Sequence, residues 1–194
     1  GELLVDFACR STDDDGYPVL AAHPGGAPAN FLAVLARYGL KTALLAKVGN
    51  DAFGRLLRRT VEREGIDTAG VVVDDAAFTT LAFVTLDENG ERDFSFARKP
   101  GADMLLRYDE LDLSLIDRTR VFHFGSVSMT DEPSRDATRR AAAYARSRGG
   151  LLTYDPNLRL PLWKDLAQAR QEMLDEAKLE VKKLRSEKNE LAWQ

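Results

Sequence analysis

Short apolar runs alternate with amphipathic segments of helical length along this chain, and this order constrains the fold more than any single motif. The strand-like runs lie at 3–7, 42–48, 121–124 and 151–154. The helical segments lie at 29–38, 51–64, 132–148 and 162 to about 177. Strands that alternate with helices form parallel sheets joined by right-handed crossovers. The pattern therefore predicts an α/β fold in which helices flank a mainly parallel sheet.

The segment between residues 79 and 97 does not follow this alternation. Asn89-Gly90 separates two runs rich in β-branched and aromatic residues, which is typical of the turn of a β-hairpin. A further short strand is predicted at 17–22. We expect these parts, about 16–22 and 76–98, to form a small antiparallel lid that projects from the sheet.

The composition excludes several classes of protein. With 194 residues, the chain is long enough to bury a core of its own. A formal net charge of -4 argues against a nucleic-acid-binding protein, which normally has a basic face. The single cysteine, Cys9, excludes an intrachain disulfide. No apolar run has the length of a membrane span and no signal peptide is visible, so we expect a cytoplasmic protein without membrane or nucleic-acid partners.

A glycine-rich run precedes the first predicted helix, in the order Gly25-Gly26-Ala27-Pro28-Ala29-Asn30. Two glycines allow close backbone approaches that other residues forbid, and the N–H groups at a helix N-terminus favour anions or polar ligands. The Asn30 side chain both donates and accepts hydrogen bonds, as sugar hydroxyls do. A tight turn before an ordinary helix start is the alternative interpretation. The spacing matches neither a Gly-x-Gly-x-x-Gly fingerprint nor a Walker A loop, so it does not indicate nucleotide binding.

Three motifs, in this order along the chain, resemble those of the PfkB (ribokinase-like) carbohydrate kinases. They are the glycine-rich run, the segment Ala46-Lys47-Val48-Gly49-Asn50-Asp51-Ala52-Phe53-Gly54 and the segment Asp155-Pro156-Asn157-Leu158-Arg159. The third motif, together with the strand at 79–84, is similar to the fructokinase branch. The resemblance covers roughly residues 1–175. It implies a ribokinase-like fold in which the sugar lies between the sheet and the lid.

The resemblance also implies roles for individual residues. The sugar-binding residues would be Asp6, Gly25, Gly26, Asn30, Phe96 and Arg98, with Arg98 facing the phosphorylated end of the sugar. Asn157 and Arg159 would lie along the path of the phosphate. From the residues alone, Asp6 could instead cap a turn, the lid phenylalanines could pack in a core, and the arginines could be solvated surface charges.

The chain departs from the family in its last part. The Gly-Ala-Gly-Asp loop, which in this family supplies the anion hole and the catalytic aspartate, is absent from the sequence. We therefore assign no catalytic residue and no metal ligand, and we expect the chain to be C-terminally incomplete. Residues 1–175 are predicted to form the N-terminal part of the kinase domain. The highly charged residues 176–194 are predicted to form a helical tail, to which no role is assigned.

Together, the motifs and the resemblance predict a sugar kinase of the fructokinase type that uses ATP and Mg²⁺. The alternative is a non-catalytic sugar-binding or dimerising module that keeps the sugar site and lacks the nucleotide half. Apolar residues on the thin lid, among them Leu81, Phe83 and Phe94, further predict a homodimer in which the lid is buried.

Overall fold

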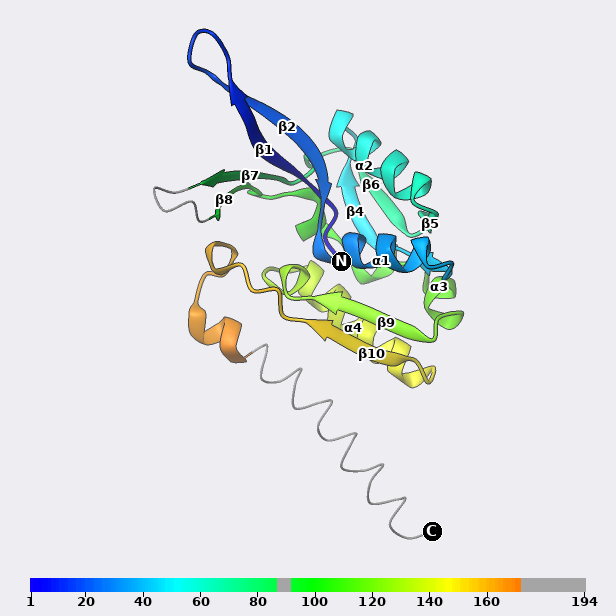
Figure 1. The fold of residues 1–194 in the computed structure, drawn as a ribbon. Helices are drawn as coiled ribbons and strands as arrows, with labels where there is room; N and C mark the ends of the chain where they lie inside the picture. Colours follow the sequence, from blue (N-terminus) through cyan, green and yellow to red (C-terminus); the bar gives the residue numbers. More distant parts are fainter. Residues whose placement is uncertain (87–91, 172–194) are drawn as a thin grey trace, which may run out of the picture.

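The lid of this protein is a four-stranded sheet that includes the first strand of the chain (Figure 1). The computed structural model describes residues 1–86 and 92–171. The strands lie in the order β2 (Pro18–Gly25), β1 (Leu4–Thr12), β7 (Leu81–Leu86) and β8 (Arg92–Ala97). β1 pairs antiparallel with β2 and parallel with β7, whereas β7 and β8 are antiparallel. The predicted hairpin is confirmed; its Asn89-Gly90 turn lies outside the described residues.

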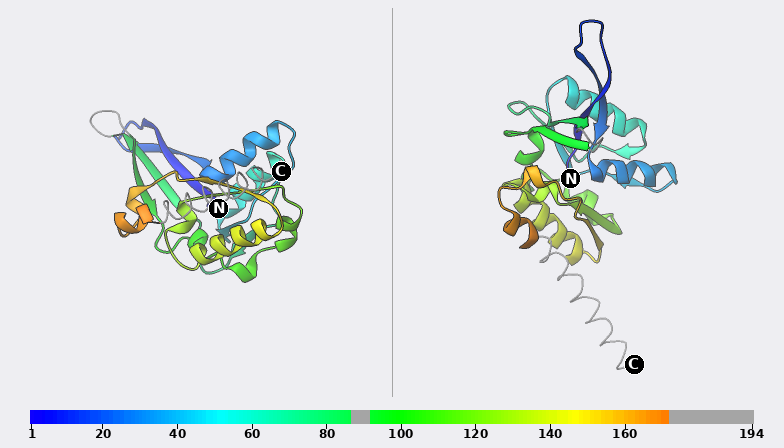
Figure 2. Two further views of the ribbon diagram at one scale, coloured as in Figure 1. Left: turned by 90° about the horizontal axis from the view of Figure 1, so that it is seen from below. Right: turned by 60° about the vertical axis from the view of Figure 1, so that its left-hand side comes forward.

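The first strand is longer than predicted. We expected it at residues 3–7, but β1 continues to Thr12 because its second half pairs with β2. Asp13 holds the turn that follows: its Oδ1 accepts hydrogen bonds from the N–H groups of Asp15 at 3.1 Å and Tyr17 at 2.8 Å. Figure 2 shows this hairpin projecting from the rest of the molecule. The polar end of β1 is held by its partner strand rather than by burial, so an apolar pattern could not reveal it.

Helices cover the parallel strands in the rest of the molecule. The α-helices are α1 (Ala27–Arg37), α2 (Ala52–Arg63), α3 (Leu113–Asp117) and α4 (Ser134–Ser147). Short 3₁₀-helices lie at Ala102–Leu105, Tyr108–Glu110, Val127–Met129 and Leu160–Leu162. The parallel pairs are β3 (Thr42–Ala43) with β5 (Ile66–Asp67), β4 (Ala46–Gly49) with β6 (Val71–Asp74), and β9 (Val121–Gly125) with β10 (Leu151–Asp155).

The predicted fold class, an α/β protein with mainly parallel strands and a small antiparallel lid, is confirmed. One strand differs from its prediction. The run at 42–48 is divided into β3 and β4, which pair with different partners. The parallel strands are therefore hydrogen-bonded in separate pairs. Helices α1, α2 and α4 pack against these pairs, and α2 also packs against β1 (Figure 1).

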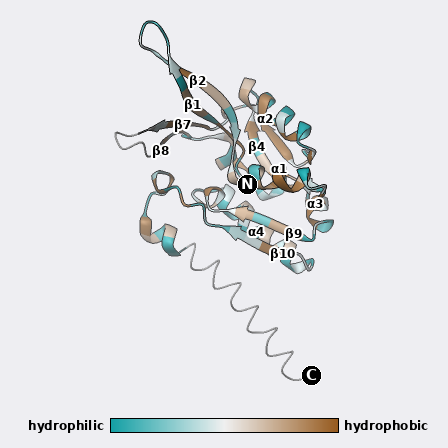
Figure 3. Ribbon diagram, in the orientation of Figure 1, coloured by the Kyte–Doolittle hydropathy of each residue, from teal (hydrophilic) through white to brown (hydrophobic). Residues whose placement is uncertain are grey.

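Three apolar clusters lie among the described residues, one of them around Met129 and Trp163, and the other two hold the layers together. One cluster joins the start of β1 to α1 and α2 and includes Leu3, Ala29 and Leu57. The other lies between α4 and the β9–β10 pair and includes Ile116 and Ala141. Figure 3 shows hydrophobic residues along the strands and hydrophilic residues at the tip of the β1–β2 hairpin. The start of β1 and the first turn of α1 thus belong to the same packed core.

One helix start agrees with its prediction, and two helices begin later than predicted. Asp51 caps α2 as expected, because its Oδ1 accepts a hydrogen bond from the N–H group of Gly54 at 2.8 Å. α4 begins at Ser134 rather than at residue 132. The helix expected from residue 162 begins at residue 166; its continuation beyond residue 171 and the tail at 176–194 lie outside the described residues. Within the described ranges, no helix combines the length and the apolar character that a membrane span requires.

Candidate functional site

A cavity of about 550 Å³ opens between the lid and the rest of the molecule. Its walls come from β1, β2, the first turn of α1, the lid strands and the segment that follows β10. Residues that the sequence singled out line this cavity together: Asp6, Gly26, Asn30, Phe96, Asn157 and Arg159. Segments far apart in the chain therefore meet at one opening whose size suits a small-molecule ligand.

The glycine turn at Gly25-Gly26 lies at the floor of the cavity, where Gly26 lines the opening and Gly25, contrary to the prediction, does not. Gly26 has a φ of 111°, and a Cβ atom there would overlap the backbone carbonyl oxygen of Glu2, so the position requires glycine. Gly25 is buried against Asp6, because a Cβ atom at Gly25 would overlap that carboxylate. α1 begins directly after the turn with Pro28 among its first residues, so the N-terminus of the helix faces the cavity.

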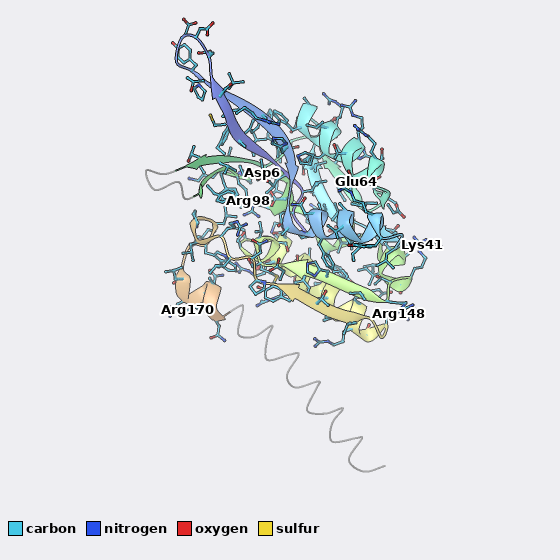
Figure 4. The ribbon with its side chains drawn as sticks, viewed as in Figure 1. Asp6, Lys41, Glu64, Arg98, Arg148 and Arg170 are labelled. Carbon is cyan, nitrogen blue, oxygen red and sulfur yellow. The ribbon has the colours of Figure 1, made fainter. Side chains whose placement is uncertain are left out.

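Asp6 lies on β1 opposite His23 of β2, and both side chains line the cavity. Figure 4 shows Asp6 where the lid strands join the rest of the molecule. Burial raises the pKa of Asp6, and the charges of Arg159 and His23 act in the opposite direction. The carboxylate is placed to accept hydrogen bonds from a ligand hydroxyl. His23 was not among the predicted site residues, because a histidine in a short strand gives no signal of the ligand it faces.

Two phenylalanines of β8 form the lid side of the cavity. Phe94 and Phe96 are alternate residues of one strand, and they therefore point to the same face, with stacked rings whose centroids are 6.2 Å apart. The guanidinium carbon of Arg159 lies 5.3 Å from the centroid of the Phe94 ring. This cation–π contact connects the lid with the segment after β10.

Asn157 and Arg159 follow the C-terminal end of β10, where α/β sheets commonly place ligands. Asp155 organises this turn: its Oδ1 accepts a hydrogen bond from the backbone N–H of Asn157 at 3.0 Å, and Asn157 has a φ of 29°. The turn brings the Asn157 and Arg159 side chains to the cavity wall. The amide and guanidinium groups give this end of the cavity hydrogen-bond donors that suit phosphate oxygens.

Arg98 was predicted to bind the sugar at its phosphorylated end, and the structure places it elsewhere. It does not line the cavity, and its side chain is only 3% exposed. Its Nε and Nη2 atoms lie 2.9 Å and 2.8 Å from Oδ2 of Asp103, and Nη1 donates to Oγ1 of Thr130 at 2.9 Å. The guanidinium is thus paired with buried groups at the base of the lid. The sequence analysis missed this because Thr130 is distant along the chain and Asp103 carries no motif.

Glu2 is a further residue that the sequence analysis did not single out. It lies at the base of the cavity, is 3% exposed, and accepts a hydrogen bond at Oε1 from the backbone N–H of Ala27 at 3.0 Å. Burial raises the pKa of Glu2, and the hydrogen bond from the backbone N–H of Ala27 acts in the opposite direction. No sequence signal links Glu2 to Ala27, because the contact exists only once β1 and α1 are packed together.

The described ranges, 1–86 and 92–171, contain no group of three or more histidine, cysteine, aspartate or glutamate side chains that could hold a metal ion. The Gly-Ala-Gly-Asp sequence that would surround a nucleotide phosphate is absent from the 194 residues. No Mg²⁺ or ATP ligand is assigned among the described residues. What they form is a pocket in which carboxylate, amide and guanidinium groups lie under an aromatic lid.

Comparison with known proteins relates this arrangement to enzymes. Residues 2–181 match the pfkB family carbohydrate kinases. Fructokinase-1 of Zea mays is 47% identical over 176 residues, which are 90% of this chain and 54% of that relative. The fructokinase structure from Xylella fastidiosa has a TM-score of 0.81 at 35% identity and covers 86% of this chain and 51% of its own. A fructokinase double mutant from Vibrio cholerae O395, solved with fructose, ADP and potassium ion, has a TM-score of 0.79 at 32% identity and covers 91% of this chain and 55% of its own.

The chain spans about half the length of the curated relatives it matches. Within that half, the match includes the strands, helices and turns that build the cavity. The predicted resemblance is confirmed: the chain belongs to the pfkB family of carbohydrate kinases.

Proposed function

We propose that this chain forms the sugar-binding part of a kinase that transfers a phosphoryl group from ATP, with Mg²⁺, to a hydroxyl of fructose. The observation that carries this proposal is the convergence of Asp6, Asn30 and Arg159 from three separate elements on one cavity. The fructokinase relatives support fructose as the acceptor, and the Xylella fastidiosa fructokinase solved with bound ATP supports the donor.

Each polar group has a defined task in this proposal. The Asp6 carboxylate accepts hydrogen bonds from sugar hydroxyls, and the Asn30 amide donates to and accepts from them. Asn157 and Arg159 lie at the end of the cavity that receives the phosphate, where a guanidinium pairs with phosphate oxygens. Phosphoryl transfer depends on positioning and charge stabilisation, so residues that fix the orientation of the acceptor hydroxyl contribute directly to the rate.

The lid excludes water from the sugar. Phe94 and Phe96 present an apolar surface above the polar floor, and the contact between Phe94 and Arg159 spans the opening. Closure of such a lid protects a phosphoryl donor from hydrolysis. The lid strands and the segment after β10 therefore act together once a sugar is bound.

The proposal is tested by measuring sugar binding and ADP formation with the same preparation. The chain is titrated with fructose, glucose, ribose and 2-keto-3-deoxygluconate, and ADP release is then followed with ATP and Mg²⁺. We expect saturable binding with a preference for fructose. Absence of binding for all four sugars would overturn the assignment.

A second candidate is a sugar-binding module without catalysis. It is favoured by the lining of the cavity, which has groups that can bind a sugar and none to which a catalytic role is assigned. The same experiment separates the two candidates. Fructose binding without fructose-dependent ADP formation supports the module, whereas ADP formation that depends on fructose supports the kinase.

We also propose that the lid mediates homodimer formation. The β1–β2 hairpin has exposed large apolar side chains, Tyr17, Val19 and Leu20, whose exposed fractions are 68%, 44% and 41%. A thin hairpin with such side chains gains stability when a second copy covers it. Light scattering at micromolar concentration should give the mass of a dimer, and a Val19→Glu variant should give the mass of a monomer. A monomeric mass for the unaltered chain would contradict the proposal.

A further inference from the structure

The buried carboxyl group of Glu2 lies beneath the glycine turn, where no role has been assigned to it. Glu2 precedes β1, is 3% exposed, and lines the same cavity as Asp6 and Asn30. A carboxyl group buried to this extent is rare unless its oxygens have partners, because an unpaired buried polar atom costs free energy. The two carboxyl oxygens of Glu2 have different surroundings.

The first oxygen completes the start of α1. The N-cap residue of this helix is Gly26, which has no side chain to accept a hydrogen bond, and Pro28 has no N–H group to be satisfied. Oε1 of Glu2 accepts the N–H of Ala27 at 3.0 Å. Glu2 therefore acts as the cap that Gly26 cannot provide, and a carboxylate at a helix N-terminus is also favoured by the helix dipole.

The second oxygen has no partner in the protein. Oε2 is buried and makes no hydrogen bond with any residue in the described ranges. Glu2 lines the cavity, so a ligand placed on the glycine turn would lie against this residue. A sugar hydroxyl can donate or accept, so it can pair with Oε2 whether the carboxyl group is ionised or protonated.

We propose that Glu2 is a positioning residue that holds the N-terminus of α1 through Oε1 and hydrogen-bonds a hydroxyl of the bound sugar through Oε2. The second half of this inference rests on the proposed sugar-binding function. The first half concerns the fold of the chain and is independent of any ligand.

The experiment compares Glu2→Ala and Glu2→Gln with the unaltered chain. The first readout is hydrogen exchange of the Ala27 amide. Glutamine keeps an oxygen for that amide and alanine does not, so exchange should be at least about tenfold faster in Glu2→Ala and within about threefold of the original rate in Glu2→Gln. Glu110→Gln serves as the matched control. Glu110 is a largely buried acid that does not line the cavity, and its Oε1 lies 2.8 Å from Nζ of Lys47.

The second readout is the affinity for fructose and for its monodeoxy analogues. One monodeoxy analogue should bind the unaltered chain about tenfold more weakly than fructose. This ratio of the two dissociation constants should fall at least about fivefold in Glu2→Ala. In Glu110→Gln, the ratio and the Ala27 exchange rate should both stay unchanged.

Three results would overturn the inference. An unchanged Ala27 exchange rate in Glu2→Ala would remove the helix-capping role. An unchanged ratio in Glu2→Ala, with fructose still bound by the unaltered chain, would remove the sugar contact and leave the proposed function intact. Absence of fructose binding by the unaltered chain would remove the sugar contact and the proposed function together, while the exchange rates would still decide the helix-capping role.

Discussion

Arg98 and Asp103 form a buried ion pair at the base of the lid, with Nη2 of Arg98 2.8 Å from Oδ2 of Asp103 and both side chains 3% exposed. Asp103 also accepts a hydrogen bond at Oδ1 from Thr80. The pair thus joins the segments that flank β7 and β8 to the 3₁₀-helix at Ala102–Leu105. The arginine that the sequence suggested for the phosphate is instead part of the framework that supports the lid.

Removal of this arginine should therefore affect stability. Arg98→Ala leaves Asp103 buried without its charge partner, which should lower the free energy of unfolding by about 3–5 kcal/mol. Urea denaturation measures the loss. At a temperature where Arg98→Ala remains folded, its affinity for fructose should be within about threefold of the original. Unchanged stability with a large loss of sugar affinity would instead restore Arg98 to the ligand site.

Gly25 should not tolerate a side chain. The methyl group of Gly25→Ala would overlap the Asp6 carboxylate and lie 2.9 Å from Cδ1 of Leu4, so the site must deform at a cost of about 1–3 kcal/mol. We expect a loss of fructose affinity of at least about fivefold in calorimetry. Gly125→Ala is the matched control, because its methyl group would meet its nearest neighbour, the carbonyl oxygen of Asp155, at an ordinary 3.5 Å. Equal effects of the two substitutions would contradict a specific role for Gly25.

The sugar affinity should depend on pH through Asp6. Burial raises the pKa of Asp6 and Arg159 opposes that rise, so affinity should fall as the pH drops through this raised pKa and the carboxylate is protonated. Arg159→Ala removes the opposing charge, and the fall should then begin at a higher pH. Calorimetric titrations between pH 4 and 8 measure both profiles, with Arg170→Ala as the control. A pH profile that Arg159→Ala does not move would contradict the coupling.

His123 should make the fold less stable in mild acid. It packs on Phe31 with ring centroids 4.4 Å apart, and its Nδ1 is 2.9 Å from Oγ1 of Thr153. Burial lowers the pKa of His123 below 6.5, so the unfolded chain binds the proton first. The stabilisation is complete above pH 6.5 and is lost as the pH falls toward the folded-state pKa. Thermal unfolding from pH 5 to 7 should show this slope, and His123→Gln should reduce it. An unchanged slope in His123→Gln would contradict this account.

Local signals predicted much of the fold and part of the site. The order of strands and helices and the cap at Asp51 follow from periodicity and side-chain chemistry over a few residues. Gly26 and Asn30 were identified from the glycine-rich run before α1 together with the resemblance to the PfkB kinases, and Asp6 was identified from that resemblance. Their convergence on one cavity is seen in the structure, and their roles toward a sugar stay predictions.

The remaining features depend on contacts between distant residues. Arg98 carries a charge that fits a phosphate or a buried carboxylate equally well, and only the fold decides between them. Glu2 meets Ala27 across the start of β1 and the glycine turn. The extension of β1 to Thr12 depends on pairing with β2 rather than on its own polar sequence. Sequence patterns report burial and local geometry, and these three features are set by partners elsewhere in the chain.

The central claim, that this chain builds a sugar site around Asp6, is tested most directly by calorimetric titration with fructose. We predict saturable binding of one fructose per chain for the unaltered protein and at least a tenfold weaker affinity for Asp6→Ala, because the carboxylate supplies a charged hydrogen bond worth about 1.5–3 kcal/mol. Equal binding by both proteins, or no binding by the unaltered chain, would contradict the claim.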